Sequence, residues 1–184
     1  MNSGKIRKQY LQILPKLQDT LSLVQDRLSD LPQPDFELDI NLKPFESVKR
    51  KMGADHLKKI TDMSDLVRGR LFFSDQYISK EIIKLMKELL HDWIKKIDVK
   101  RHGEYNLQYH GIIHIDLNID GISFELQIMP IEYKPFKLFF HKIYELLREP
   151  KNNLSEEQKA KLIKKHNKIY EAVYNKAQSN RGLN

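Results

Sequence analysis

Apolar residues recur at helical spacing at both ends of the chain. They form a broad stripe in residues 4–31 and recur every three or four positions in residues 155–178. Ser155 and Gln158 have the spacing of a capping box at the start of the second segment. Pro15 lies inside the first segment and predicts a kink or a split there. We therefore expect long N-terminal and C-terminal helices, the first of them interrupted.

The part of the chain between these helices mixes strand and helix patterns. Two prolines in residues 31–35 separate it from the N-terminal helix. Alternating runs predict strands and periodic runs predict helices. The predicted strands are 36–42, 66–73 and 95–100, with two more after them, and the predicted helices are 44–52, 78–94 and about 132–148.

This order of elements is typical of the α+β class. We expect a mixed or antiparallel sheet of about five strands, flanked by helices. A length of 184 residues suits one domain better than two. The prediction is a single domain over residues 1–184, with a core at about 36–148 and helical extensions at 4–31 and 155–178.

Residues 112–129 predict a β-hairpin. Two alternating runs flank Asp120-Gly121, a dipeptide that suits a two-residue type I′ turn. This turn pairs Ile119 with Ile122 and fixes the register of the whole hairpin. All residues on one face are then apolar, so that face belongs to the core.

The opposite face of the hairpin is polar. The register pairs Asp116 with Glu125 and His114 with Gln127. Two carboxylates directly across a ladder repel each other unless a cation or solvent relieves the repulsion. The face is either an ordinary solvent-facing surface or a platform whose oxygen ligands suit magnesium and a nucleotide.

Basic side chains gather in two further places. Alternation puts Arg68 and Arg70 on one face of the strand 66–73, with Asp65 at its entrance, an arrangement suited to phosphate or to ordinary ion pairs. A spacing of four residues would put three further residues on one side of a helix. That side is either a triphosphate-binding edge or a solvated helix face. These three are Lys43, Ser47 and Lys51.

Composition narrows the function classes. The chain has no cysteine, which excludes disulfides, thiolate zinc sites and a cysteine nucleophile and fits a cytoplasmic location. No apolar run approaches the ~20 residues of a membrane span, so we expect no membrane contact. The net charge of +7 favours polyanionic partners, and most of it lies in residues 151–184. The basic C-terminal helix is either a solvated surface or one that faces RNA or another partner.

Five short motifs, in order, resemble those of the RelA/SpoT synthetase domain, in its small, synthetase-only form. The resemblance covers about residues 36–148. The motifs are Lys43-x3-Ser47-x3-Lys51, Asp65-x4-Arg70, Tyr109-x4-His114, Glu125-x-Gln127 and His141-x2-Tyr144.

The resemblance implies a nucleotidyltransferase-like fold and a magnesium-dependent pyrophosphokinase. Such an enzyme transfers the β,γ-diphosphate of ATP to the ribose 3′-hydroxyl of GDP or GTP, which makes the alarmone (p)ppGpp. It also implies self-association, which is common among small synthetases. Asp65 and Glu125 become the catalytic residues and the Mg2+ ligands, with Glu125 also a candidate base. The implied ATP contacts are Lys43, Ser47, Lys51, Arg68 and Arg70, the acceptor contacts are Tyr109, His110, His114 and Gln127, and the supporting residues are His141 and Tyr144.

Three departures from the family pattern leave alternatives open. Asn41 stands where an arginine is usual, and Arg68-Gly69 reverses the usual order of glycine and its neighbour. Tyr109 lies five residues before the motif's histidine instead of four, so either a bulge corrects the register or His110 takes its place. The alternatives are pyrophosphorylation of adenine nucleotides or tRNA 3′ ends, and a non-catalytic RNA-binding or interaction module.

Overall fold

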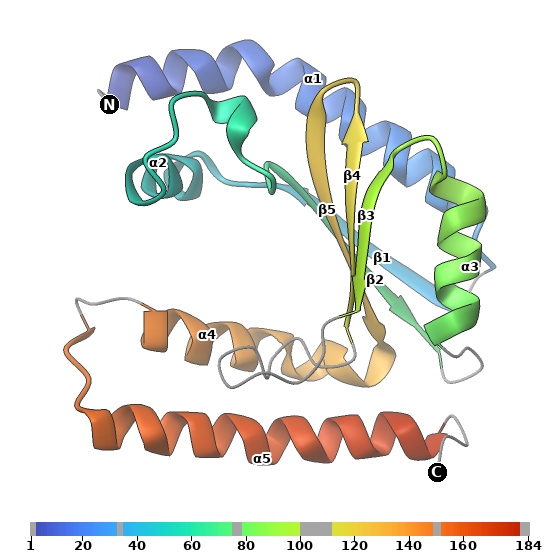
Figure 1. Ribbon diagram of the computed structural model, residues 1–184, viewed down its shortest axis with the longest axis vertical. Helices are drawn as coiled ribbons and strands as arrows, with labels where there is room; N and C mark the ends of the chain where they lie inside the picture. The colour runs from blue at the N-terminus through green and yellow to red at the C-terminus, as the bar shows by residue number, and fades with distance from the viewer. Residues whose placement is uncertain (1–2, 33–34, 75–78, 100–111, 149–151, 181–184) are drawn as a thin grey trace.

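A computed structural model describes residues 3–32, 35–74, 79–99, 112–148 and 152–180 (Figure 1). The helices are α1 (Ser3–Ser29), α2 (Phe45–Ala54), α3 (Ser79–Leu90), α4 (Lys137–Arg148) and α5 (Glu156–Asn180). The strands are β1 (Phe36–Leu42), β2 (Val67–Phe73), β3 (Ile94–Val99), β4 (Ile113–Ile119) and β5 (Ile122–Pro130). The 3-10 segments η1 (Ile60–Asp62) and η3 (Ile131–Phe136) precede β2 and α4.

The five strands form one mixed sheet in the order β1-β2-β5-β4-β3. Only β2 and β5 run parallel, and the other neighbouring pairs are antiparallel. The predicted α+β class, with a mixed sheet of five strands and long terminal helices, is confirmed. The parallel pair matters most for the site, because it places Arg68 opposite Glu125 and Arg70 opposite Gln127.

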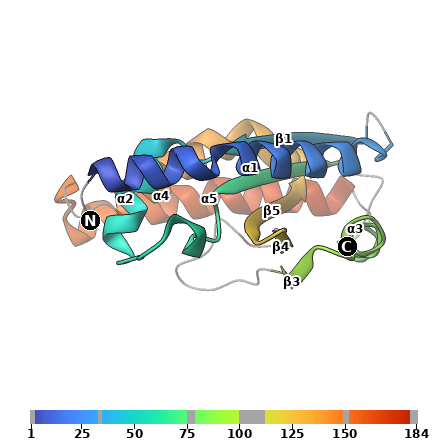
Figure 2. The same ribbon diagram turned by 90° about the horizontal axis from the view of Figure 1, so that it is seen from above.

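The apolar face of the sheet carries the main core. Helices α1 and α3 cover this face, and α1 runs along the molecule over β1 (Figures 1 and 2). Along β2, Val67, Gly69 and Leu71 point into this core, whereas Arg68 and Arg70 are only partly buried. Alternation along each strand therefore leaves the polar residues on the opposite face.

Helices α4 and α5 cover only one end of that opposite face. Phe72 and Met129 project from the ends of β2 and β5 into a second apolar cluster with Tyr133, Phe140 and Tyr170. Helix α5 lies against α4 and η3, on the side of α4 away from the sheet (Figure 1). The rest of the polar face lines an open cavity, described below.

The hairpin of β4 and β5 has the predicted register. Ile119 pairs with Ile122, and the two turn residues have positive φ, 49° for Asp120 and 82° for Gly121. Positive φ at both central positions is the property of a type I′ turn, which glycine and aspartate tolerate well. The alternating apolar residues of both strands are at most 2% exposed. Turn chemistry and alternation together thus determined the register.

Two predictions about helices need correction or extension. Helix α1 continues through Pro15, so the predicted split is wrong. Proline removes one backbone donor, but Leu11 and Pro15 are both exposed and water can bind the released carbonyl. The predicted helix at 132–148 begins as a 3-10 segment, because η3 includes Pro135.

The capping box predicted at the start of the C-terminal helix is confirmed. The Ser155 backbone amide donates to Gln158 Oε1 at 2.9 Å, and the Gln158 amide donates to Ser155 Oγ at 3.2 Å. This reciprocal pair is the predicted capping box.

Among the described residues, no helix combines the length and the apolar character that crossing a bilayer requires.

Gly69 offers a test of how tightly the sheet packs on its apolar face. A Cβ added there would lie 2.9 Å from both Leu126 Cδ1 and Phe124 Cζ, so we expect Gly69→Ala to lower the free energy of unfolding by about 1–3 kcal/mol. Denaturant unfolding measures this change. Gly53→Ala is the matched control, because a Cβ on this exposed helical glycine meets nothing within 4 Å and should stabilise α2 by about 0.5–1 kcal/mol. Equal effects of the two changes would contradict the packing argument.

Candidate active site

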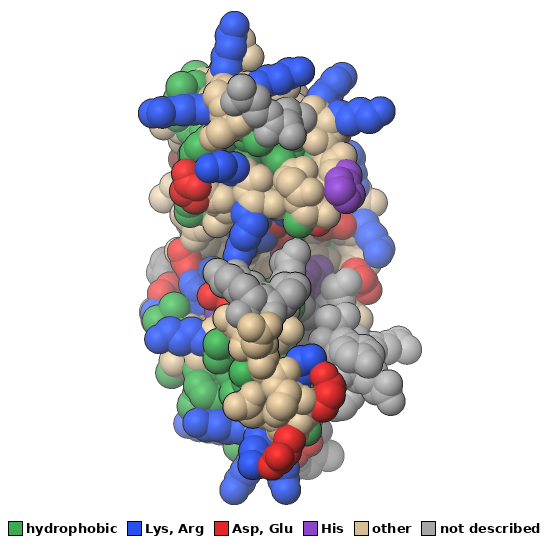
Figure 3. All heavy atoms as spheres, turned by 90° about the vertical axis from the view of Figure 1, so that its left-hand side faces the viewer, with side chains coloured by type: hydrophobic (Ala, Val, Ile, Leu, Met, Phe, Trp, Pro, Cys, Tyr) green, Lys and Arg blue, Asp and Glu red, His purple; other side chains and the backbone are tan. Residues whose placement is uncertain are grey.

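A cavity of about 810 Å³ lies on the polar face of the sheet, between α2 and α4. Figure 3 views the molecule from this side, where the surface is recessed between an upper part with α1 and α2 and a lower part with α4 and α5. Ten of the thirteen candidate site residues line the cavity. They are Lys43, Ser47, Lys51, Asp65, Arg68, Arg70, Glu125, Gln127, His141 and Tyr144.

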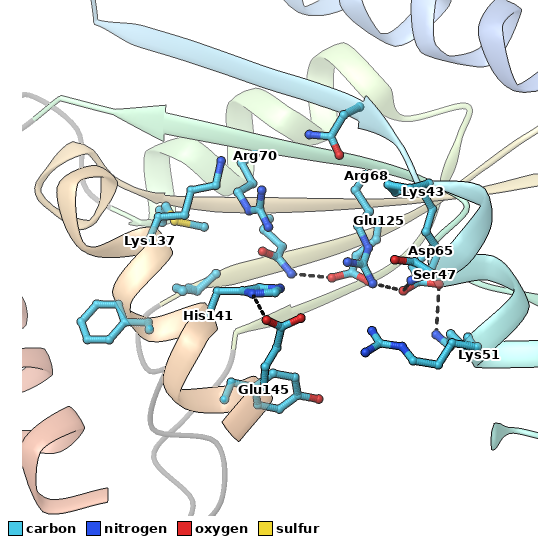
Figure 4. Close-up of a pocket in the computed structure, with 18 of the residues that line it drawn as sticks. Lys43, Ser47, Lys51, Asp65, Arg68, Arg70, Glu125, Lys137, His141 and Glu145 are labelled. Carbon is cyan, nitrogen blue, oxygen red and sulfur yellow. Dashed lines mark hydrogen bonds and ion pairs between the residues drawn. The ribbon is translucent and has the colours of Figure 1, made fainter. Parts of the chain in front are cut away.

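Asp65 is the centre of the basic end of this cavity. Its side chain is 3% exposed and accepts hydrogen bonds from Lys43 Nζ at 2.7 Å and Lys51 Nζ at 3.0 Å. Arg68 Nη2 forms a third ion pair with the same carboxylate (Figure 4). The three cations come from the end of β1, from α2 and from β2. One buried carboxylate therefore gathers cations from three separate elements.

The electrostatics of this cluster are strongly perturbed. Burial by itself raises the pKa of Asp65, but the hydrogen bond from Lys43 and the charges of Arg68 and Lys51 outweigh it and hold that pKa well below 3.8. Burial lowers the pKa of Lys43, and the bond to Asp65 opposes that shift. Lys43 is only 7% exposed, which is rare for a lysine without an anionic partner. The carboxylate thus stays ionised and keeps its cations in place.

A second carboxylate–cation cluster lies farther along the sheet. Asp39 of β1 pairs with Lys137 of α4, and its Oδ2 lies 3.7 Å from Arg70 Nη1. The hydrogen bond from Lys137 lowers the pKa of Asp39 despite partial burial. Lys134 of η3 forms a second ion pair with Glu37 of β1, so two ion pairs connect η3 and the start of α4 to β1.

Glu125 lies between the two basic clusters, beside Arg68 (Figure 4). Its Oε1 accepts a hydrogen bond from Gln127 Nε2 at 2.5 Å, and His114 Nδ1 lies 3.8 Å from the same oxygen. Asp116 is its partner across the ladder but is exposed and does not line the cavity. Glu125 is therefore the carboxylate of this hairpin that faces the cavity.

Helix α4 supplies the other wall. His141 and Tyr144 project from it into the cavity, and His141 Nδ1 lies 3.5 Å from Glu145 Oε2, one turn farther on. Phe140 lines the same wall and packs on His166 of α5, with ring centroids 4.9 Å apart. This wall is more aromatic than the end around Asp65.

Sequence reasoning did not single out Lys137, Asn41 or Glu145 as cavity residues, and it gave no role to Arg50. Helical spacing carried a usable signal for two of them, because Lys137 and Glu145 lie one turn before and after His141. Arg50 lies three residues after Ser47 and shares its helix face. The pairing of Asp39 with Lys137 spans 98 residues, and nothing local predicts it.

Of the three remaining candidates, His114 alone is among the described residues, and it does not line the cavity. His114 reaches Glu125 from the neighbouring strand and stands behind it. Tyr109 and His110 lie outside the described residues. The proposed stacking of an acceptor base on Tyr109 or His110 therefore stays a prediction.

The carboxylates of the cavity suit a magnesium ion that also binds substrate phosphates. Asp65 and Glu125 offer two carboxylates on one cavity, and Mg2+ commonly binds one or two carboxylates together with substrate phosphates and water. Within the described ranges, no three His, Cys, Asp or Glu side chains cluster closely enough to bind a metal by themselves. A metal here would thus require phosphate oxygens to complete its coordination.

Sequence comparison alone finds no relatives: no family model matches the chain, and no curated protein matches it. Solved structures do match. Small alarmone synthetase 1 from Bacillus subtilis, bound to its product pppGpp, is 16% identical with a TM-score of 0.68 over 96% of both chains. This chain has the fold of the small alarmone synthetases.

Two further structures support this assignment of the fold. The same Bacillus subtilis protein bound to AMPCPP is 16% identical, with a TM-score of 0.54 over 98% of this chain and 97% of the other. A structure of the Type VI effector Tas1 in complex with its immunity protein is 18% identical, with a TM-score of 0.64 over 91% of this chain and 97% of the other. The resemblance to the synthetase domain is thus confirmed at the level of the fold.

Replacing Asp65 tests the electrostatic description of the site. Asp65→Asn leaves three cations without their carboxylate, so we expect a loss of about 3 kcal/mol in the free energy of unfolding near neutral pH. The folded-state pKa of Asp65 is depressed, so its stabilisation is present above the ordinary pKa of 3.8 and is lost as the pH falls toward the folded value. Denaturant unfolding at several pH values should show the gap between variant and wild type narrowing below about pH 4.

Asp19→Asn serves as the control for this measurement. Asp19 is an exposed carboxylate on α1, and its replacement should change stability by less than about 0.5 kcal/mol. A gap for Asp65→Asn that stays constant from neutral to acidic pH would contradict the ionised, triply paired carboxylate.

Proposed function

We propose that the protein is a magnesium-dependent pyrophosphokinase that transfers the β,γ-diphosphate of ATP to the 3′-hydroxyl of a guanine nucleotide. One observation carries this proposal. The cavity places a cluster of cations suited to a triphosphate next to Glu125, a carboxylate with an amide and an imidazole around it. The fold of the small alarmone synthetases supports the same activity.

The basic end of the cavity suits the diphosphate donor. Lys43, Lys51 and Arg68 supply charged donors, and guanidinium and ammonium groups bind phosphate oxygens strongly. Asp65 neutralises only part of their charge. Arriving phosphates therefore compete with this carboxylate for cations that are already in position, which limits the reorganisation that binding requires.

Glu125 is suited to act as the general base. It accepts the proton of the acceptor 3′-hydroxyl while that oxygen attacks the β-phosphorus of ATP. The bond between the β-phosphorus and the oxygen bridging it to the α-phosphorus breaks, and AMP leaves. Gln127 and His114 orient the carboxylate toward this proton. Bound magnesium supplies neutralisation of phosphate charge, as is usual for phosphoryl transfer.

The acceptor is assigned to the α4 side of the cavity. Phe140 and Tyr144 offer aromatic surface for a base, and Lys137 is suited to acceptor phosphates. Arg70, expected from the sequence to contact ATP, lies beside Lys137 at Asp39 and is proposed here to serve the acceptor instead. The Bacillus subtilis neighbour holds pppGpp, a guanine nucleotide, and this supports GDP or GTP as the acceptor here. Adenine nucleotides and tRNA 3′ ends remain as alternative acceptors for the assay.

The test is transfer of label from γ-labelled ATP, with Mg2+ and GDP, GTP, ATP or tRNA as separate acceptors. We expect labelled product with a guanine nucleotide. Glu125→Gln should lower kcat by about 100-fold to 10,000-fold, because a neutral amide cannot accept the proton. The matched control is Asp116→Asn, which removes the carboxylate directly across the ladder but outside the cavity and should leave kcat within about twofold.

The outcomes separate the candidate functions. Label in tRNA or an adenine nucleotide alone would keep the chemistry and change the acceptor. No transfer to any acceptor would refute the proposed activity. Equal losses in Glu125→Gln and Asp116→Asn would refute the role of Glu125 as the base.

A further inference from the structure

Helix α1 reaches the basic end of the cavity through Tyr10. The Tyr10 hydroxyl donates a hydrogen bond to the backbone carbonyl of Lys43 at 3.0 Å. The Tyr10 ring packs on Phe45, the first residue of α2, with ring centroids 5.7 Å apart. A residue 33 positions earlier in the chain thus contacts the junction between β1 and α2.

This junction carries a residue that is anchored at three points. The Lys43 amide donates to the carbonyl of Leu66 at 2.8 Å, and Lys43 Nζ donates to Asp65 at 2.7 Å. The bond from Tyr10 to the carbonyl is the third anchor. The first two anchors come from the segment that leads into β2, and Tyr10 connects the same residue to a different helix.

Helix α2 adds no further anchor to Lys43. This residue lies before the first turn of α2, whose N-cap is Pro44 with no side-chain cap. The helix itself therefore does not fix the Lys43 peptide. The Tyr10 hydroxyl is protonated at neutral pH and can donate, and burial raises its pKa further above 10.

We propose that Tyr10 is a positioning residue for the diphosphate-donor half of the cavity, and that α1 is thereby a working part of the nucleotide site. This inference rests on the proposed function. Tyr10 acts through Lys43 and does not line the cavity itself. Its loss should therefore weaken the binding of ATP and leave the acceptor side, which α4 and β5 build, unchanged.

The experiment compares Tyr10→Phe with Tyr170→Phe. Both changes remove one hydroxyl and keep the ring, and Tyr170 loses a 3.2 Å hydrogen bond to Tyr133 in the cluster between η3 and α5. Tyr170 does not line the cavity. Tyr10→Phe should raise the KM for ATP about threefold to tenfold, the effect of one lost hydrogen bond. The KM for the acceptor and kcat should stay within about twofold, and Tyr170→Phe should change none of the three.

Binding of the ATP analogue AMPCPP with Mg2+, measured by calorimetry, separates the two proposals. Suppose that the wild type binds AMPCPP, that Tyr10→Phe alone binds it more weakly, and that the wild type transfers no label. The proposed function then fails and the positioning role stands. If the wild type transfers label and Tyr10→Phe leaves the KM for ATP unchanged, the positioning role fails alone. A rise in both KM values, or the same rise in Tyr170→Phe, would also overturn it, because a general loosening of the fold has that effect. No AMPCPP binding by the wild type would overturn both.

Discussion

The ion pairs of Asp65 hold together the part of the molecule on which any chemistry depends. A buried carboxylate is unfavourable unless charged donors surround it, and here the donors come from β1, α2 and β2. The same contacts decide where α2 and the entrance of β2 lie relative to each other. The pairing with Asp65 holds the three cations in place without a ligand, and the positive charge that one carboxylate leaves uncompensated attracts an anion.

The unequal faces of the sheet explain why there is a cavity at all. Helices α1 and α3 cover the apolar face, whereas α4 and α5 rest on only the end that carries Phe72 and Met129. Had the polar residues of β2 and β5 been apolar, α4 would have to pack along the whole face. Instead Arg68, Arg70 and Glu125 keep it open. The placement of the site thus follows from where the second apolar cluster ends.

Local patterns were sufficient for much of this architecture. The register of β4 and β5 follows from Asp120-Gly121 and the alternation around it, and the faces of β2 follow from alternation alone. The pairing of Asp39 with Lys137 and the bond from Tyr10 to Lys43 could not be predicted in this way. They join segments far apart in the chain, and their geometry depends on the packing of whole helices. Sequence motifs therefore identified the residues of the cavity better than the residues that position them.

The order Arg68-Gly69 is the reverse of that in the motif which this strand resembles, and the packing of the sheet accommodates it. Gly69 faces the core, where Phe124 and Leu126 occupy the space that a side chain would need. Arg68 consequently faces the cavity and reaches Asp65, at the position where the motif that this strand resembles has a glycine. Phe124 and Leu126 of β5 fill the core beside Gly69, and Arg68 adds a guanidinium to the cavity. Positive charge near Asp65 favours the binding of a polyanion, which agrees with the proposal that this end of the cavity binds ATP. The Arg68-Gly69 order therefore adds positive charge to the site and keeps the alternation of the strand that builds it.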